Sequence, residues 1–574
     1  MGTGSNEDEL SMDEIKSVLR QLRSELELLR AENERLTEEN RALRDRLASK
    51  AGGGGGGPSG CRDSEYERLR KKAKEQRAAK RRRAAARAHA EPKARCRGRR
   101  SRRPPFVADQ IMVRDIPEGE LSADAKRNGF VNRPFYGVRI VRHNVLVRMR
   151  EYKSRTHGRT VAKLPEGWSG EFTPDTHVTI NTLSMGGMTE PKIKELFADH
   201  GVTISAGQVN HILLNTADML RQEQVAAHRA GLENSPAVGI DGTHSTCDGE
   251  PMVCHIVGNE VFTSMTTTEH KDRVTVIGVL AGEPVGHCVG DHALAHPDLG
   301  VAAREVLRRV SNGEPAREGA DAELVELSNE LRTKGLDGPK MDQFLERALP
   351  VASADTRRQM REATAGQWLR TVLSCLPLVM LADGGTNYHG ILAFLQLCWI
   401  HMLRPFSLLA ECADSTRVLQ EGWVLYRRIC AWRDAPDRLE AAAIGADFDR
   451  VFDPQRCTDD DLRHQVNLTR VHKDDLLTVL RHPYAPAENN GQERAAKARV
   501  RKRDVSFGPR SKRGLRAWDT MQSVVGTLRK LQISPAAFIA DRVTRGRRFE
   551  TLDVLVKNEC IRRYGPRQET TGTF

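Results

Sequence analysis

The chain has 574 residues and a net charge of +13 at pH 7, and its length suits two to four domains. It contains no apolar run near the roughly eighteen residues that a membrane-spanning helix needs, and its polar, acidic start is unlike a signal peptide. Its eleven cysteines are odd in number and include no C-x-x-C pair, which argues against a disulfide framework. We therefore expect a soluble, intracellular protein without a membrane partner.

A heptad repeat occupies residues 11–50, after a short polar segment, 1–10, that we expect to be disordered. Leucine dominates both core positions of the repeat, and two of these positions hold asparagine. A buried asparagine is tolerated best opposite its own copy, so the pattern predicts a parallel coiled coil that joins a homodimer. The alternative is one amphipathic helix that folds back on its own chain. The core positions are Ile15, Leu19, Leu22, Leu26, Leu29, Asn33, Leu36, Asn40, Leu43 and Leu47.

Residues 51–105 combine a glycine-rich stretch with a strongly basic one. Six consecutive glycines predict a flexible linker. Residues 62–103 then hold 19 Lys and Arg against 5 Asp and Glu, so this segment alone accounts for the positive net charge of the chain. Such a segment binds phosphates with salt-dependent affinity, and we predict a DNA-binding arm. A solvated helix without a ligand is the alternative.

Residues 106–232 are expected to form an N-terminal DNA-binding region. Alternating apolar and basic residues predict strands in 136–150. Residues 191–200 predict a helix that Gly201 ends, and a cap residue at 205 is expected to start a second helix. This order is typical of a helix-turn-helix, although other helical hairpins share it. The candidates for DNA contact at the second helix are Ser205, Gln208 and Asn210.

Two apolar runs within residues 233–505 each end in an aspartate that is followed by glycine. One run, 237–240, predicts a buried strand that ends at Asp241, and another, 376–382, predicts a strand that ends at Asp383. A third carboxylate, Glu493, lies in a stretch with helical character. Each acid also has a simpler structural explanation. Asp-Gly commonly forms a turn, and Glu493 follows Asn490 at the spacing of a capping box.

From the strand that ends at Asp241 to the strand that ends at Asp383, the sequence predicts three strands, a helix, a helical insertion and a fourth strand. The predicted ranges before the fourth strand are 237–240, 252–257 and 261–267 for the strands, 272–280 for the helix and 283–370 for the insertion. This order matches the ribonuclease-H-like fold, in which the first and fourth strands are neighbours. We therefore expect a mixed α/β fold with a ribonuclease-H-like catalytic core. The coiled coil, basic linker and helix-turn-helix region precede it, and a C-terminal helical region, 506–574, follows with two short helices.

Three neighbouring carboxylates offer the hard oxygen ligands that Mg²⁺ prefers, with Mn²⁺ as the alternative ion. Two such ions can activate the attacking oxygen and stabilise the leaving oxygen when a phosphodiester is displaced. We therefore predict Asp241, Asp383 and Glu493 as metal ligands and catalytic residues. Nearby residues that are candidates for contacts with DNA phosphate, or else for an ordinary solvated face, are His401, Arg404, Arg494, Lys497, Arg501, Lys502 and Arg503.

Cys398 and His401 have the C-x-x-H spacing of a pair of metal ligands. A structural zinc site needs four ligands, however, and no second pair in the sequence has a suitable spacing. We therefore predict no zinc, and we expect Cys398 to be a buried core residue.

Several motifs resemble those of the DDE transposases of the insertion-sequence sixty-six family. They are G-I-D-G-T-H with Asp241, L-A-D-G-G-T-N-Y with Asp383, Q-L-C-W-I-H-M-L-R, and E-N-N-G-Q-E-R with Glu493. The resemblance implies a DNA transposase that uses Mg²⁺, held by the three acids, to cleave the ends of a mobile element and transfer the strands. It also implies double-stranded DNA, both element ends and target, as partner, with accessory proteins of the same element as further candidates. The expected location is the cytoplasm at the bacterial nucleoid, or the nucleus if the source is eukaryotic.

The sequence departs from that family in two ways. A cysteine-rich zinc module is common there between the zipper and the helix-turn-helix, whereas this chain offers only Cys61 and Cys96 in that region. The insertion between the aspartates is also longer than the family leads us to expect. Two other functions stay open: a non-catalytic DNA-binding protein derived from a transposase, and a ribonuclease-H-like nuclease.

Overall fold

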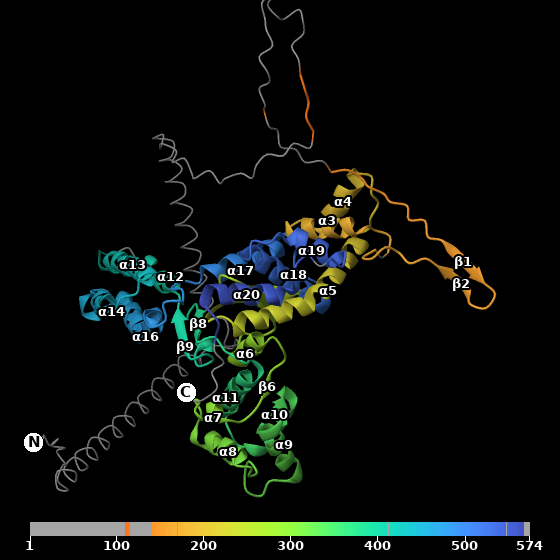
Figure 1. Cartoon of the computed structure of the whole chain (residues 1–574). Helices are drawn as coiled ribbons and strands as arrows, with labels where there is room; N and C mark the ends of the chain where they lie inside the picture. Colours follow the sequence, from red (N-terminus) through yellow and green to blue (C-terminus); the bar gives the residue numbers. More distant parts are fainter. Residues whose placement is uncertain are drawn as a thin grey trace, which may run out of the picture. The chain divides into compact units, whose positions relative to one another are not determined.

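A five-stranded mixed sheet organises the chain in the computed structural model shown in Figure 1. The structure describes residues 110–114, 133, 140–168, 170–409, 413–546 and 548–567. The predicted coiled coil, glycine-rich linker and basic arm lie outside these residues. The chain divides into two units, 1–127 and 128–574, and the helices and strands described all belong to the second.

The sheet has the strand order β5-β4-β3-β8-β9. Strand β3 (Ala237–Cys247) pairs antiparallel with β4 (Glu250–Gly258), and β4 pairs antiparallel with β5 (Thr263–Thr268). On its other side β3 runs parallel to β8 (Val379–Ala382), which runs parallel to β9 (Phe394–Leu397). The prediction of a mixed α/β fold is confirmed, and the two strands that lead to the aspartates are neighbours.

Strand β3 is longer than the sequence predicts. The apolar run ends at Ile240, but the pairing with β4 continues, with Asp241 opposite Ile256 and Cys247 opposite Glu250. The parallel pairing with β8 stops earlier, at Gly239. Polar residues are tolerated beyond that point because only one neighbouring strand covers them. Asp241 therefore lies inside a strand, and its interpretation as an Asp-Gly turn residue is wrong.

One edge of the sheet is covered by helix α18 (Lys512–Lys530). The outward backbone N–H groups of β5 donate to side chains of this helix, in the pairs Thr263–Thr527, Met265–Ser523 and Thr267–Asp519. Four helical residues rise about 6 Å and two strand residues advance about 6.7 Å, so the two spacings nearly match. The helix thus provides hydrogen-bond acceptors for the backbone N–H groups of an edge strand that could otherwise pair with a strand of another chain.

Three helices run side by side in this part of the molecule (Figure 1). They are α5 (Ala206–Glu233), α18 and α20 (Leu552–Tyr564). The two predicted C-terminal helices are present as α18 and α19 (Pro535–Val543), and the sequence does not predict the third helix, α20, that follows them. Helix α20 buries only the narrow stripe Leu552, Val556 and Cys560, and such a stripe gives a weak periodic signal.

The predicted pair of helices around Gly201 is present as α4 (Glu190–Asp199) and α5. With α3 (Pro174–Met185) they enclose a small core of Ile180, Ile193, Ile204, Val209 and Ile212. The strands predicted in 136–150 are wrong for the described residues 140–150, which belong to no strand. The alternating pattern finds no partner there, and pairing begins only in the hairpin of β1 (Glu151–Ser154) and β2 (Gly158–Val161).

The region between the aspartates contains helix α6 (Arg273–Ala281) and then a helical insertion with its own core, which includes Leu307, Phe344 and Met360. Its elements are β6 (Gly286–His287), α7 (Asp291–Leu294), α8 (Val301–Ser311), α9 (Ala322–Thr333), β7 (Leu336–Asp337), α10 (Gly338–Ala348) and α11 (Ala354–Val372).

Apart from β9, the regular elements that follow β8 in the described chain are helical. The remaining elements are η2 (Thr386–Tyr388), α12 (Trp399–Leu403), η3 (Pro405–Ser407), α13 (Ala413–Asp434), α14 (Arg438–Val451), η4 (Pro454–Arg456), α15 (Asp460–Val471), α16 (Lys473–Leu476), η5 (Thr478–Leu480) and α17 (Asn490–Ser506). Within the described residues, no helix combines the length and apolar character needed to cross a membrane.

Helix α5 passes so close to the β4–β5 turn that Gly231 has no room for a side chain. A Cβ at this position would lie 2.5 Å from a ring carbon of the buried Phe262. We expect Gly231→Ala to lower the free energy of unfolding by about 1–3 kcal/mol, as overpacking does. Gly207→Ala near the start of the same helix is the matched control, because its Cβ would meet only an ordinary contact at 3.8 Å. Denaturant unfolding of both variants measures the difference, and equal effects would contradict this packing.

Candidate active site

The three predicted acids line one open groove, although they come from distant parts of the chain. Asp241 lies in β3, Asp383 immediately follows β8, and Glu493 lies in the first turn of α17. Gly239 pairs with Leu381, and Asp241 and Asp383 each lie two residues beyond this last pair of the two parallel strands, which places them at the same edge of the sheet. The groove has a volume of about 460 Å³.

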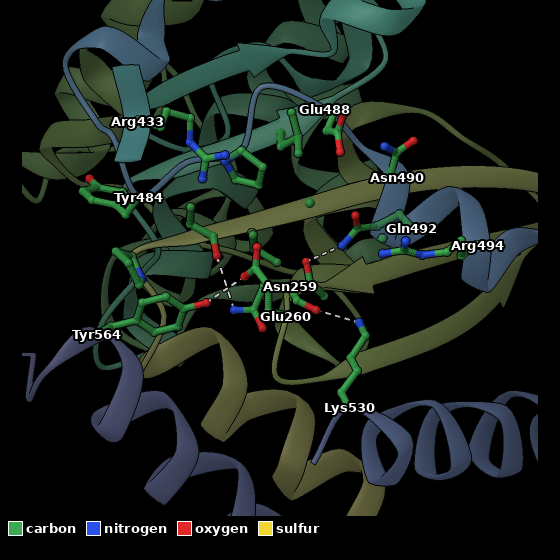
Figure 2. Close-up of a pocket in the computed structure, with 18 residues that line it drawn as sticks. Asn259, Glu260, Arg433, Tyr484, Glu488, Asn490, Gln492, Arg494, Lys530 and Tyr564 are labelled. Atoms are coloured by element: carbon green, nitrogen blue, oxygen red, sulfur yellow. Dashed lines mark hydrogen bonds between the residues drawn. The ribbon is translucent and has the colours of Figure 1, made fainter. Parts of the chain in front are cut away.

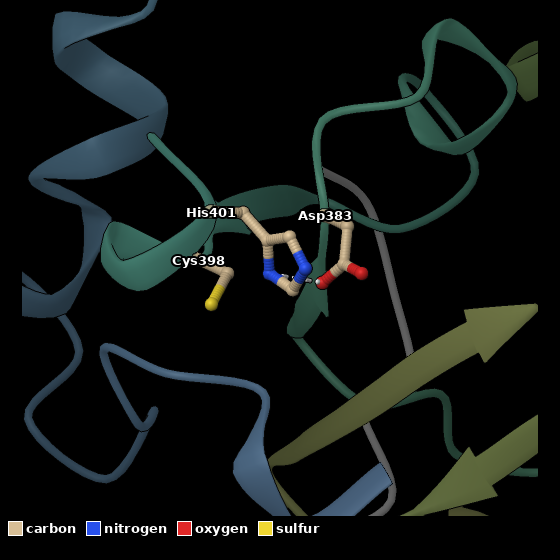
Figure 3. Close-up of side chains that lie close together, drawn as sticks. All are labelled: Asp383, Cys398 and His401. Carbon is tan, nitrogen blue, oxygen red and sulfur yellow. Dashed lines mark ion pairs between the residues drawn. The ribbon is translucent and has the colours of Figure 1, made fainter. Parts of the chain in front are cut away.

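His401 in α12 joins two of the acids. Its Nδ1 lies 3.2 Å from Oδ1 of Asp383 and 3.7 Å from Oε1 of Glu493. Oδ1 of Asp383 and Oε1 of Glu493 are therefore at most 6.9 Å apart. Figure 3 shows the imidazole directed at the Asp383 carboxylate.

Asn489 fastens the start of α17 to the strands that carry the aspartates. Its side-chain amide donates to the carbonyl of Ile240 at 2.9 Å and to Oδ1 of Asp383 at 3.2 Å. The motifs considered above do not single out Asn489, although the polar run E-N-N-G-Q-E at the start of a helix contains it. The capping-box explanation of Glu493 is wrong, because the helix begins at Asn490 and makes no side-chain capping bond.

Crowding of negative charge perturbs the site. Burial, followed by the negative charges of Asp383 and Glu493, raises the pKa of Asp241 to about 7, against the opposing effects of the Gly242 N–H and Lys271. The Gly242 N–H donates to the Asp241 carboxylate at 2.7 Å. Like charges brought together in this way are stabilised by a bound cation.

Two buried oxygens of residues in this region also lack a hydrogen bond. Among the described residues, Oε1 of Glu493 and Oδ1 of Asn489 are buried and have no hydrogen-bond partner. Oxygen donors without partners beside a raised carboxylate pKa fit a hard divalent cation. Asp241, Asp383 and Glu493 therefore offer oxygen ligands of the kind such an ion takes, although the three acids do not form one set of donor atoms within 4.8 Å of one another.

A second donor set overlaps the first. Asp383, Cys398 and His401 each offer one ligand atom within 4.8 Å of the others (Figure 3). Cys398 is 1% exposed, which confirms its prediction as a buried residue, and burial raises the pKa of its thiol. A thiol must lose its proton to bind a metal, so Cys398 is the weakest member of this set. The structure thus shows acidic and histidine groups suited to a metal and leaves the identity of the ion open.

Four of the predicted DNA-contacting residues line the same groove as the acids: His401, Arg404, Lys497 and Arg501. Lys497 lies one helical turn after Glu493, with 3.6 Å between its Nζ and the carboxylate. Three cationic side chains therefore border the acids, as a groove for a phosphate backbone requires.

Arg494 does not join this groove, because consecutive helical residues point about 100° apart. It lines a separate pocket of about 350 Å³ on the other side of the first turn of α17, shown in Figure 2. The polar groups there bond to one another: the Tyr564 hydroxyl donates to Glu260 at 2.8 Å, and Lys530 donates to the carbonyl of Asn259 at 2.6 Å. This pocket therefore has few free groups for a ligand.

Lys502 and Arg503 also lie outside the residues that line the groove. Lys502 lies over the ring of Trp518, with its Nζ 5.0 Å from the ring centroid, and burial lowers its pKa to about 8. Arg503 donates to the backbone carbonyl of His244 at 2.6 Å. Both side chains thus hold α17 against its neighbours.

The candidates at the second helix of the helix-turn-helix make structural bonds. Ser205 and Gln208 form a reciprocal capping box at the start of α5. Asn210 donates to Glu190 at 2.9 Å and so ties α5 to α4. Their role in DNA contact stays a prediction.

No family model matches the sequence. The chain is similar to the uncharacterized protein y4jO of Sinorhizobium fredii, with 25% identity over 334 residues, which is 55% of this chain and 94% of that protein. Because that protein is uncharacterized, the similarity indicates no activity for this chain.

Proposed function

We propose that this protein is a DNA transposase with a ribonuclease-H-like core, similar to those of the insertion-sequence sixty-six family. One observation supports the proposal above all: Asp241, Asp383 and Glu493, chosen from sequence motifs, line a single groove beside neighbouring parallel strands. Its substrates are the double-stranded ends of a mobile element and the target DNA, and the coiled coil at 11–50 joins two copies.

Each group in the groove has a chemical role in this proposal. Asp241, Asp383 and Glu493 hold divalent magnesium, which when bound activates an oxygen nucleophile and neutralises charge on the phosphate. His401 orients the carboxylates of Asp383 and Glu493, which it contacts at 3.2 and 3.7 Å. Arg404, Lys497 and Arg501 bind the phosphates on either side of the scissile bond.

A strand-transfer assay tests this proposal. Duplexes that carry the inverted repeats flanking the coding region are incubated with the full-length protein, Mg²⁺ and a plasmid target. We expect cleavage at the repeat ends and joining to the plasmid, with loss of both on chelation by EDTA. Glu493→Gln should lower both by more than about 100-fold, since changes that only support a metal ligand already cost about 10–100-fold.

Glu260→Gln serves as the matched control, because Glu260 is a carboxylate that lines the separate pocket of Figure 2. Its cleavage and joining should equal those of the unaltered protein. Cleavage without joining would identify a nuclease instead. Binding of the repeats without cleavage in any divalent ion would identify a non-catalytic DNA-binding protein.

A further inference from the structure

A second group of metal-ligating side chains lies away from the acid groove. It consists of His389, which follows η2, His472 between α15 and α16, and Asp475 in α16. Each offers one ligand atom within 4.8 Å of the others. None of the three lines the groove of Asp241, Asp383 and Glu493.

The donor atoms of these three side chains are spaced nearly as the ligands of one metal ion are. Oδ2 of Asp475 lies 3.6 Å from Nδ1 of His472 and 4.0 Å from Nδ1 of His389. Both distances exceed the roughly 2.7–3.2 Å of a hydrogen bond, so the carboxylate is bonded to neither ring. Ligands at about 2.0–2.2 Å from one zinc ion are roughly 3.3–3.6 Å apart in a tetrahedron, and a small contraction of this group reaches that spacing.

Neighbouring charges do not neutralise Asp475. Lys473, two residues before it, pairs with Asp449 at 2.6 Å, and Asp474 pairs with Arg481 at 3.5 Å. Among the described residues, no lysine or arginine pairs with Asp475. A cation bound between the three side chains would therefore compensate the negative charge of Asp475, which has no lysine or arginine partner among the described residues.

The chemistry and exposure of the donors select the class of ion. Two imidazoles and one carboxylate suit zinc and related transition metals, whereas Mg²⁺ prefers oxygen ligands alone. The side chains of His389, His472 and Asp475 are 36%, 32% and 28% exposed, so an ion can enter and keep water at its remaining position.

We propose that His389, His472 and Asp475 form a zinc site that binds one ion, separate from the acid groove. The site fastens the loop that follows Asp383 to the α15–α16 corner, because His389 is only six residues beyond Asp383. Zinc binding itself does not depend on the proposed transposase activity. The sequence does not reveal this group of ligands, because His389 and His472 are 83 residues apart.

The test is a zinc titration of the full-length protein after removal of metals with a chelator, followed by calorimetry. We expect one zinc equivalent to be lost, or bound at least about 100-fold more weakly, in His389→Gln, His472→Gln and Asp475→Asn. His464→Gln, an exposed histidine on α15, is the matched control and should bind zinc as the unaltered protein does. Asp383→Asn should also keep this equivalent, which separates the site from the acid groove.

Thermal unfolding with and without zinc gives an independent readout. Zinc should raise the midpoint of the unaltered protein and of His464→Gln, because a ligand that binds only the folded state stabilises it, and it should not raise that of His472→Gln. Equal midpoints of these proteins in chelator would show that the variants fold. Unchanged zinc stoichiometry and affinity in both His389→Gln and His472→Gln would overturn the proposal.

Discussion

Asp241→Asn is expected to abolish DNA cleavage while it makes the metal-free protein more stable. The amide removes a ligand charge, so cleavage should fall by more than about 100-fold. It also removes a carboxylate that lies beside Asp383 and whose pKa burial raises to about 7. Cleavage assays and thermal unfolding of the same preparation measure the two effects, and a variant that cleaves DNA at the normal rate would contradict the proposed site.

The stability gain should depend on pH. The pKa of Asp241 is about 7 in the folded protein, against an ordinary value of 3.8, so the folded state holds this proton more tightly. The folded protein therefore loses stability as the pH rises from about 4 to 7, by at most about 4 kcal/mol and by about 2 kcal/mol in an open groove. Asp241→Asn should remove this loss, with a midpoint about 2–4 °C higher at pH 7.5 and little change at pH 4.

Asp519→Ala is expected to be the most destabilising substitution in the C-terminal helices. Asp519 in α18 forms an ion pair with Arg499 at 3.0 Å, and the two side chains are 7% and 1% exposed. It also accepts hydrogen bonds from the backbone and the hydroxyl of Thr267, both at 2.8 Å. The substitution leaves the Arg499 charge buried and unpaired, which costs about 3–5 kcal/mol. Urea unfolding measures the loss.

Asp504→Ala is the matched control, because Asp504 pairs with Arg503 at 3.3 Å while 62% exposed. An exposed pair contributes less than about 1 kcal/mol, so this variant should unfold nearly as the unaltered protein does. Arg499→Leu combined with Asp519→Leu should be less damaging than Asp519→Ala alone, since neither buried charge is left without its partner. Equal losses for Asp519→Ala and Asp504→Ala would show that the buried pair has no special role.

The sequence predicts β3, β4, β5 and β8 of the sheet, but it does not predict β9, which is only four residues long. The neighbouring position of the strands before Asp241 and Asp383 follows from the order of elements. The polar half of β3 is missed, because a strand covered on one side only needs no apolar pattern there. The hairpin of β1 and β2 shows the same limit, since all its residues are exposed.

At the candidate site, the sequence predicts which acids meet but not how the surrounding cations divide. Arg494, Lys497 and Arg499 lie within six positions on one helix. The structure directs Lys497 to the groove, Arg494 to the pocket of Figure 2, and Arg499 into the core against Asp519. The direction of each side chain depends on its angle around the helix axis and on where α18 packs. The composition of the segment contains neither kind of information.

The hydrogen bonds between α18 and β5 can form only late in synthesis, because β5 is made long before α18. Strand β5 is complete at Thr268, but the side chains that bond its outer edge are at 519, 523 and 527. At about 5–20 residues per second, the ribosome needs roughly 10–50 s to make the intervening chain. During that time the edge is a template for strands of neighbouring nascent chains. A polypeptide that ends before α18 would therefore aggregate through this edge. Only a chain that includes α18 can cover the edge and remain a monomeric sheet.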